Sequence, residues 1–145
     1  MARGIIVYLS YTGNTKSIAE SIHRGMSPRL EQCDIVRLRE TDPKVLAGYD
    51  LIGIGSPVRL SEMPAELRAF IDGMPSLEGK HGFVFNTHGA TAQNFMRTAV
   101  TALREKGLVV IGFIDWYCSV WLAHIPKPYL IFWHELWLDE TRFNI

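Results

Sequence analysis

The chain has 145 residues, 48% of them hydrophobic, and its 15 basic and 15 acidic side chains give a formal net charge of zero. This length and apolar content are typical of one globular domain, which we expect to span residues 1–145. The charge balance argues against nucleic acid or an acidic membrane surface as a partner, because both are bound through strongly basic patches.

Apolar runs that suit β-strands alternate with segments of helical periodicity along most of the chain. The predicted strands cover residues 5–9, 33–38, 50–54, 82–86 and 108–114. The predicted helices cover residues 14–26, 43–47, 64–71 and 91–106. This alternation favours a parallel sheet with right-handed crossovers. The second strand alternates polar and apolar residues, so we expect it at an edge of the sheet.

One long apolar segment, residues 108–123, contains Asp115 as its only charged residue. Its length approaches that of a membrane-spanning helix. Gly107 precedes it, however, directly after the charged residues 104–106, and this pattern is typical of the end of a helix. We therefore interpret the start of the segment as a buried strand and expect no membrane span.

The cysteines predict a reducing compartment. Cys33 and Cys118 lie far apart in the sequence and form no C-x-x-C pair, so we interpret them as reduced thiols of a cytoplasmic protein. The chain passes from Met1 almost directly into its first strand, which leaves no room for a signal peptide.

An aromatic-rich tail begins at about residue 116. Residues 116–137 hold all four tryptophans and two prolines. Pro128 is expected to open a last helix that reaches Leu136 or beyond. Apolar residues cover most of the circumference of that helix, so it needs a partner surface. A homodimer interface is one explanation of the tail, and a truncated C-terminus is the other.

The segment Ser10–Lys16, S-Y-T-G-N-T-K, joins the first strand to the first helix. Backbone N–H groups at such a junction point at a common centre, and the helix N-terminus adds partial positive charge, so anions bind there. A Walker A loop needs glycine where this chain has Ser10 and Thr15. A dinucleotide fingerprint needs three glycines, and only Gly13 is present.

The remaining interpretation is a phosphate held by uncharged donors. Hydroxyls of Ser10, Thr12 and Thr15 can surround a terminal phosphate together with backbone N–H groups through Asn14 and Thr15. Gly13 allows the backbone to turn tightly and to approach the ligand. A helix N-cap would explain one such residue, but not three hydroxyls in six positions.

This segment resembles the phosphate loop of the flavodoxin family, whose members bind FMN. The strand and helix order agrees with that family through about residue 114, which is most of the chain. The resemblance implies a three-layer α/β fold with a doubly wound parallel sheet of order 2-1-3-4-5. It also places FMN at the switch point between the first and third strands, where the loops after the third and fourth strands would meet the flavin.

The loop after the third strand is expected to border the flavin ring. Its residues in that role are Ser56, Pro57, Val58 and, as a cation that would favour the anionic reduced flavin, Arg59. The stretch Ser56–Asp72 also resembles FMN-dependent quinone and flavin reductases of the same fold. It contains no glycine after Ser56, whereas many flavodoxins have one whose peptide flips on reduction.

The loop after the fourth strand is expected to meet the pyrimidine end of the ring. Thr87 and His88 would donate hydrogen bonds to the pyrimidine oxygens, and Gly89 would allow a tight turn beneath the ring. Neither loop contains the tryptophan or tyrosine that many flavodoxins stack on the flavin. Trp116 and Tyr117 are the nearest aromatic candidates, although core packing is the more ordinary role for both.

Two functions stay open. The first is an FMN-binding electron-transfer protein that exchanges electrons with redox partner proteins. The second is an FMN-dependent NAD(P)H oxidoreductase, a quinone or flavin reductase, which the stretch Ser56–Asp72 and the aromatic tail favour. In both, the cofactor carries the redox chemistry and the protein sets its potential and access. No nucleophile triad, catalytic acid–base pair or metal-ligand spacing competes with these interpretations.

Overall fold

A computed structural model describes residues 2–58, 62–88 and 93–117. Its centre is a parallel sheet of five strands in the order β2-β1-β3-β4-β5. The predicted doubly wound sheet is therefore confirmed, with the second strand at an edge. The strands are β1 (Arg3–Tyr8), β2 (Gln32–Arg37), β3 (Leu51–Pro57), β4 (His81–His88) and β5 (Val109–Tyr117).

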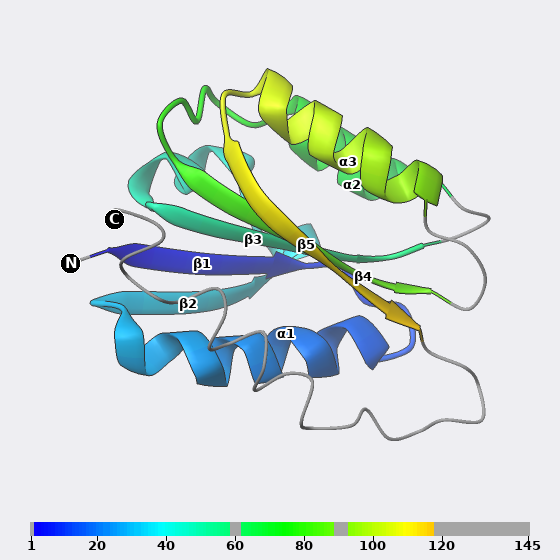
Figure 1. Cartoon of the computed structure of the whole chain (residues 1–145), viewed down its shortest axis with the longest axis horizontal. Helices are drawn as coiled ribbons and strands as arrows, with labels where there is room; N and C mark the ends of the chain where they lie inside the picture. The colour runs from blue at the N-terminus through cyan, green and yellow to red at the C-terminus, as the bar shows by residue number, and fades with distance from the viewer. Residues whose placement is uncertain (1, 59–61, 89–92, 118–145) are drawn as a thin grey trace.

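Helices cover both faces of the sheet and complete three layers (Figure 1). Helix α1 lies on one face, and α2 and α3 lie on the other. The α-helices are α1 (Asn14–Met26), α2 (Ala65–Asp72) and α3 (Gln93–Glu105). Three short 3-10 helices, η1 (Ser27–Arg29), η2 (Leu38–Glu40) and η3 (Pro43–Gly48), lie in the connections. None of the helices in the described ranges is long and apolar enough to cross a bilayer.

The structure corrects two predicted elements. The segment that begins at Pro43 is a 3-10 helix, and the Asp42 side chain accepts the N–H of Lys44 at 3.0 Å at its start. Strand β5 continues to Tyr117 rather than ending at residue 114, because its ladder with β4 runs on to His88. The predicted last helix from Pro128, together with Cys118 and the rest of the tail, lies outside the described residues.

The core consists of two apolar clusters, one on each face of the sheet. Strand β1 supplies both, because successive side chains point to opposite faces: Ile5 and Val7 join the cluster of α2 and α3, whereas Ile6 joins that of α1. A strand buried on both faces is a continuous apolar run, which is how β1 stood out in the sequence. The predicted inward positions Ile18 on α1 and Phe95 on α3 are fully buried.

Two glycines in β3 leave room for aromatic rings of β4. The rings of Phe83 and Phe85 stack with their centroids 6.2 Å apart on the α1 side of the sheet. A Cβ atom at Gly53 would lie 2.4 Å from Phe83, and one at Gly55 would lie 2.1 Å from Phe85. The two glycines of the sequence G-I-G therefore allow the aromatic side chains of β4 to pack closely on β3, just before the loop that follows β3.

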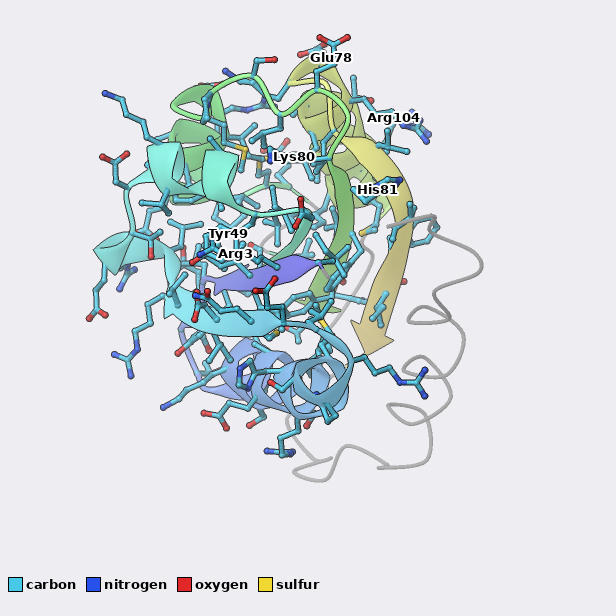
Figure 2. All side chains as sticks on the ribbon, turned by 90° about the vertical axis from the view of Figure 1, so that its left-hand side faces the viewer. Arg3, Tyr49, Glu78, Lys80, His81 and Arg104 are labelled. Carbon is cyan, nitrogen blue, oxygen red and sulfur yellow. The ribbon has the colours of Figure 1, made fainter. Side chains whose placement is uncertain are left out.

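At the amino-terminal edge of the sheet, cations bind backbone carbonyls (Figure 2). Lys80 Nζ donates to the carbonyl of Tyr49 at 2.7 Å, and the Arg3 guanidinium donates to that of Gly48 at 3.1 Å. The Arg3 guanidinium also lies 5.2 Å from the ring centroid of Tyr49. These side chains satisfy carbonyl groups of the segment before β3. The predicted site lies at the opposite end of the strands.

Candidate functional site

The predicted site lies at the switch point of the sheet. Strand β1 leads to α1 on one face, and its neighbour β3 leads to α2 on the other (Figure 1). Hydrogen bonds hold the strand ends together beyond the regular ladder: the N–H of Leu9 donates to Gly55 at 2.9 Å, and that of Val58 donates to Thr87 at 2.9 Å. The loops after β1, β3 and β4 therefore begin side by side, as ligand binding at a switch point requires.

The loop after β1 is organised by the Ser10 hydroxyl. Ser10 Oγ accepts the N–H of Gly13 at 3.1 Å and that of Lys16 at 3.4 Å. Gly13 has φ +94°, a left-handed conformation that L side chains rarely adopt, although a Cβ there would meet nothing within 4 Å. Gly13 is therefore required for its backbone conformation and not for space.

The first turn of α1 presents unused donors. Asn14 and Thr15 are the first helical residues, so their N–H groups have no carbonyl one turn back within the helix. No acceptor within the described ranges takes either N–H. The first turn contains no acidic residue, and Lys16 Nζ lies 3.9 Å from Glu20 Oε1, one turn further along the helix. These donors are uncharged main-chain groups at a helix N-terminus, and they suit an anion.

Thr15 and Thr87 meet in the interior. Their hydroxyl oxygens are 2.8 Å apart, and the two residues are 1% and 5% exposed. We predicted Thr15 for the phosphate and Thr87 for the ring, and the structure brings the two positions together. A hydroxyl has one donor and two acceptor sites, so each retains capacity for a ligand contact. Thr12 and Asn14, in contrast, are exposed.

The side chains of Ser56 and Val58, which were predicted to border the ring, contact other parts of the protein. Ser56 is fully buried, and its hydroxyl donates to the carbonyl of Pro57 at 2.8 Å. Val58 is partly buried and packs against the cluster of α2 and α3. The side chains of Ser56 and Val58 are therefore engaged within the protein, and a ligand would meet the main chain of this turn. Arg59 and Gly89, also predicted to border the ring, lie outside the described residues.

His88 is paired with a residue that the sequence analysis did not assign to the site. His88 Nε2 lies 2.7 Å from Asp115 Oδ1 on β5, and the two side chains are 11% and 46% exposed. The signal in the sequence was the single charge that interrupts an apolar run. Without the strand register, nothing connected that charge to His88.

A second group missed by the sequence analysis flanks the loop after β1. Arg39 donates twice to Glu66, at 3.0 Å through both Nε and Nη2, and its guanidinium lies 5.5 Å from the ring centroid of Tyr11. The Tyr11 hydroxyl donates to the same carboxylate at 3.2 Å. The hydrogen bond from Arg39 holds the pKa of the Glu66 carboxyl below its usual value. This Tyr11–Arg39–Glu66 cluster joins η2, α2 and the loop.

Comparison with known proteins decides the family. The family model for the flavodoxin domain matches residues 5–110. The chain belongs to the flavodoxin family. The flavodoxin of Megasphaera elsdenii is 30% identical over 110 residues, which cover 74% of this chain and 80% of that protein. A protein of Acidovorax ebreus named NAD(P)H dehydrogenase (quinone) is 24% identical over 142 residues, covering 77% of this chain and 70% of its own length.

Solved structures agree with the fold. The two-electron reduced flavodoxin of Megasphaera elsdenii superposes with a TM-score of 0.75 at 25% identity, covering 88% of this chain and 94% of that one. An archaeal flavodoxin has a TM-score of 0.75 at 21% identity and covers 99% of both chains. The apo form of an NADH:FMN oxidoreductase shares the fold, with a TM-score of 0.77 at 17% identity, and it covers 100% of this chain and 90% of that one.

FMN is the cofactor that this family implies, and the described residues fit its phosphate end. Gly13 is left-handed at the start of α1, the N–H groups of Asn14 and Thr15 have no acceptor within the described ranges, and Thr12 is exposed. No carboxylate in the first turn of α1 would oppose a phosphate dianion.

Proposed function

We propose that this flavodoxin-family chain is an FMN-dependent electron-transfer protein that exchanges electrons with redox partner proteins. The observation that carries the proposal is the set of neutral donors after β1 at the switch point, beside the ends of β3 and β4. FMN, when bound, supplies the electron-carrying chemistry. The chain supplies binding, orientation and the electrostatic environment.

The phosphate would be held by the loop after β1 and the ring by the loops after β3 and β4. Binding of the phosphate is assigned to Ser10, Thr12, Gly13, Asn14 and Thr15. Contact with the ring is assigned to Ser56, Pro57, Val58, Arg59, Thr87, His88 and Gly89. Because the hydroxyl of Ser56 donates to the carbonyl of Pro57, its contact with the ring would use main-chain atoms. No proton-transfer step is assigned to any of these residues.

A second candidate function is that of an NAD(P)H-dependent FMN oxidoreductase. It is favoured by relatives named NAD(P)H dehydrogenase (quinone), such as that of Paraburkholderia phymatum, which is 26% identical over 142 residues. A dimer through the aromatic tail would belong to this candidate, because a second chain could complete a substrate site. A cytoplasmic location is part of either candidate and rests on the cysteines.

Two measurements on the purified full chain test the proposal. Visible absorption of the protein with added FMN should shift and sharpen, and an unchanged flavin spectrum with no retained flavin would refute the FMN site. Reductive titration then separates the two functions. Reduction in two separate one-electron stages without NADH turnover supports the carrier, whereas direct two-electron reduction by NADH or NADPH with quinone turnover supports the enzyme.

A further inference from the structure

The loop after β1 leaves the carboxyl end of the sheet as an exposed segment. Residues 11–14 are all exposed, whereas Leu9 before them and Thr15 after them are buried. Helix α1, which this loop enters, covers one face of the sheet, and α2 covers the other (Figure 1). The Tyr11 hydroxyl donates to Glu66 Oε2 on α2 at 3.2 Å. This contact links the exposed loop to the layer on the opposite face.

The ion pair of Arg39 and Glu66 gives Tyr11 a fixed partner. Arg39 Nε donates to Oε1 and Nη2 donates to Oε2, both at 3.0 Å, which is the bidentate geometry of a guanidinium on a carboxylate. Glu66 lies in the first turn of α2, where the helix dipole favours a carboxylate. The neighbours Leu38 in η2 and Leu67 in α2 are buried in the core. Both partners of the pair are therefore attached to ordered elements, although their charged groups are exposed.

Tyr11 contacts both members of the pair. Its hydroxyl binds the Glu66 carboxylate, and its ring centroid lies 5.5 Å from the Arg39 guanidinium, within the range of a cation–π contact. A tyrosine side chain has few torsions, so two contacts fix it at a small cost in conformational entropy. Because Thr12 and Gly13 follow directly, fixing Tyr11 also restricts the main chain of the loop.

We propose that the Tyr11–Arg39–Glu66 cluster holds the phosphate loop in its binding conformation, a role that rests on the proposed FMN site. Arg39 and Glu66 are positioning residues that act through Tyr11. A loop that is ordered before binding spends less of the binding free energy on ordering. The apparent affinity then rises with the fraction of molecules in which the loop is in place.

The charge of Glu66 makes the proposal testable by the direction of an effect. Glu66→Gln removes a negative charge near the loop and releases the Arg39 cation from its partner. Electrostatics alone then predicts tighter binding of the phosphate dianion of FMN. Loss of positioning predicts weaker binding, because the loop is no longer held.

The first arm of the test uses the full chain without flavin. Nitrogen-15 relaxation reports the order of the Gly13 amide, whose N–H donates to Ser10 Oγ at 3.1 Å. The order parameter of Gly13 should fall in both Glu66→Gln and Tyr11→Phe. Gly107, a left-handed glycine whose N–H donates to Arg104 at 2.9 Å, is the matched reference and should be unchanged. An unchanged Gly13, or an equal fall at Gly107, overturns the inference.

The second arm measures the dissociation constants of FMN and of riboflavin, which lacks the phosphate. Glu66→Gln should weaken FMN binding about fivefold, in line with the strongest exposed ion pairs, and should leave riboflavin unchanged. Tyr11→Phe should also weaken FMN binding in the parent, but by less than about twofold in the Glu66→Gln background, because its partner is gone. Glu20→Gln removes the same charge and another exposed ion pair, that with Lys16, and should not weaken FMN binding.

The outcomes separate this inference from the proposed function. A parent protein that binds no FMN refutes the function, while the relaxation arm still tests the order of the loop. Tighter or unchanged FMN binding by Glu66→Gln overturns the inference. So does equal weakening of FMN and riboflavin, because a general loss of stability does not depend on the phosphate. Equal weakening by Glu20→Gln would show a general effect of charge and would overturn it as well.

Discussion

Thr12 is exposed and Thr15 is buried, so variants of the two residues distinguish an effect on FMN binding from an effect on stability. Thr12 is exposed, so Thr12→Ala should weaken FMN binding by about 1–3 kcal/mol without a change in stability. Thr15→Val should weaken binding similarly. It should also leave the buried Thr87 hydroxyl without its hydrogen-bond partner, which lowers the unfolding free energy by about 1–3 kcal/mol. Fluorescence titration and urea denaturation measure the two quantities.

Riboflavin, which lacks the phosphate, provides the internal reference for the threonine variants. Thr12→Ala should leave its affinity unchanged. Ser17→Ala removes an exposed hydroxyl from the same helix, beyond the predicted site, and should retain parental FMN affinity. Parental FMN binding by both Thr12→Ala and Thr15→Val would contradict the phosphate assignment.

Cys33 should be an unreactive thiol. Burial raises the pKa of Cys33 to about 11, from an ordinary value of 9.0. In a Cys118→Ser background, a thiol reagent at pH 8 should modify the native protein slowly and the urea-unfolded protein at once. Rapid modification of the folded protein would show that the β2 edge opens readily.

The pKa of Cys33 also predicts a pH dependence of stability. The thiol ionises at lower pH in the unfolded chain than in the folded one. Its contribution is therefore complete below pH 9.0 and is lost as the pH rises through about 11. The unfolding free energy of Cys33→Ala should fall less steeply across this window than that of the parent. Equal slopes would show that the thiol does not titrate differently on folding.

At the scale of elements, the approach of β3 to β4 depends on Gly55. Gly55→Ala places a methyl group 2.1 Å from Phe85, and the overpacking should cost about 1–3 kcal/mol of unfolding free energy. Gly48→Ala is the matched control, since its nearest neighbour would be the flexible Arg3 side chain at 3.9 Å. Adding Phe85→Leu to Gly55→Ala should recover part of the loss, and a double variant no better than additive would argue against a direct clash.

The Tyr11–Arg39–Glu66 cluster joins three elements by charge at the surface. Exposed ion pairs are screened by salt, so Glu66→Gln should lower the thermal midpoint at low ionic strength, and the difference should shrink in about 1 M salt. The depressed pKa of Glu66 adds stability above the ordinary carboxyl range, which is lost on acidification through the lowered value. Glu105→Gln, on exposed α3 surface, is the control, and an equal effect there would show that the cluster is not coupled.

At the scale of the whole molecule, the fold was predictable from the sequence, whereas the phosphate loop stays a prediction. Both faces of the sheet are covered, so each inner strand is an apolar run that periodicity reveals. The loop prediction was possible because the candidate donors are contiguous in the sequence from Ser10 to Thr15. The sequence did not predict that His88 pairs with Asp115 or Arg39 with Glu66, because each pair is separated by 27 residues. The register of β4 with β5 shifts between Gly82 and Phe83, and this shift decides on which face of the sheet Asp115 lies. No local sequence pattern predicts that shift.

Ligand binding at the meeting point of three loops should stabilise the entire domain. The loops after β1, β3 and β4 come from strands that form one continuous sheet, so FMN bound there is lost when the sheet unfolds. A ligand present at about 100 times its dissociation constant adds about 2.7 kcal/mol to the unfolding free energy. Urea denaturation at several FMN concentrations should show this gain growing with the logarithm of concentration. Adenosine monophosphate, which has a phosphate but no flavin, should give a much smaller gain, and an equal gain from both would show that the ring loops contribute nothing.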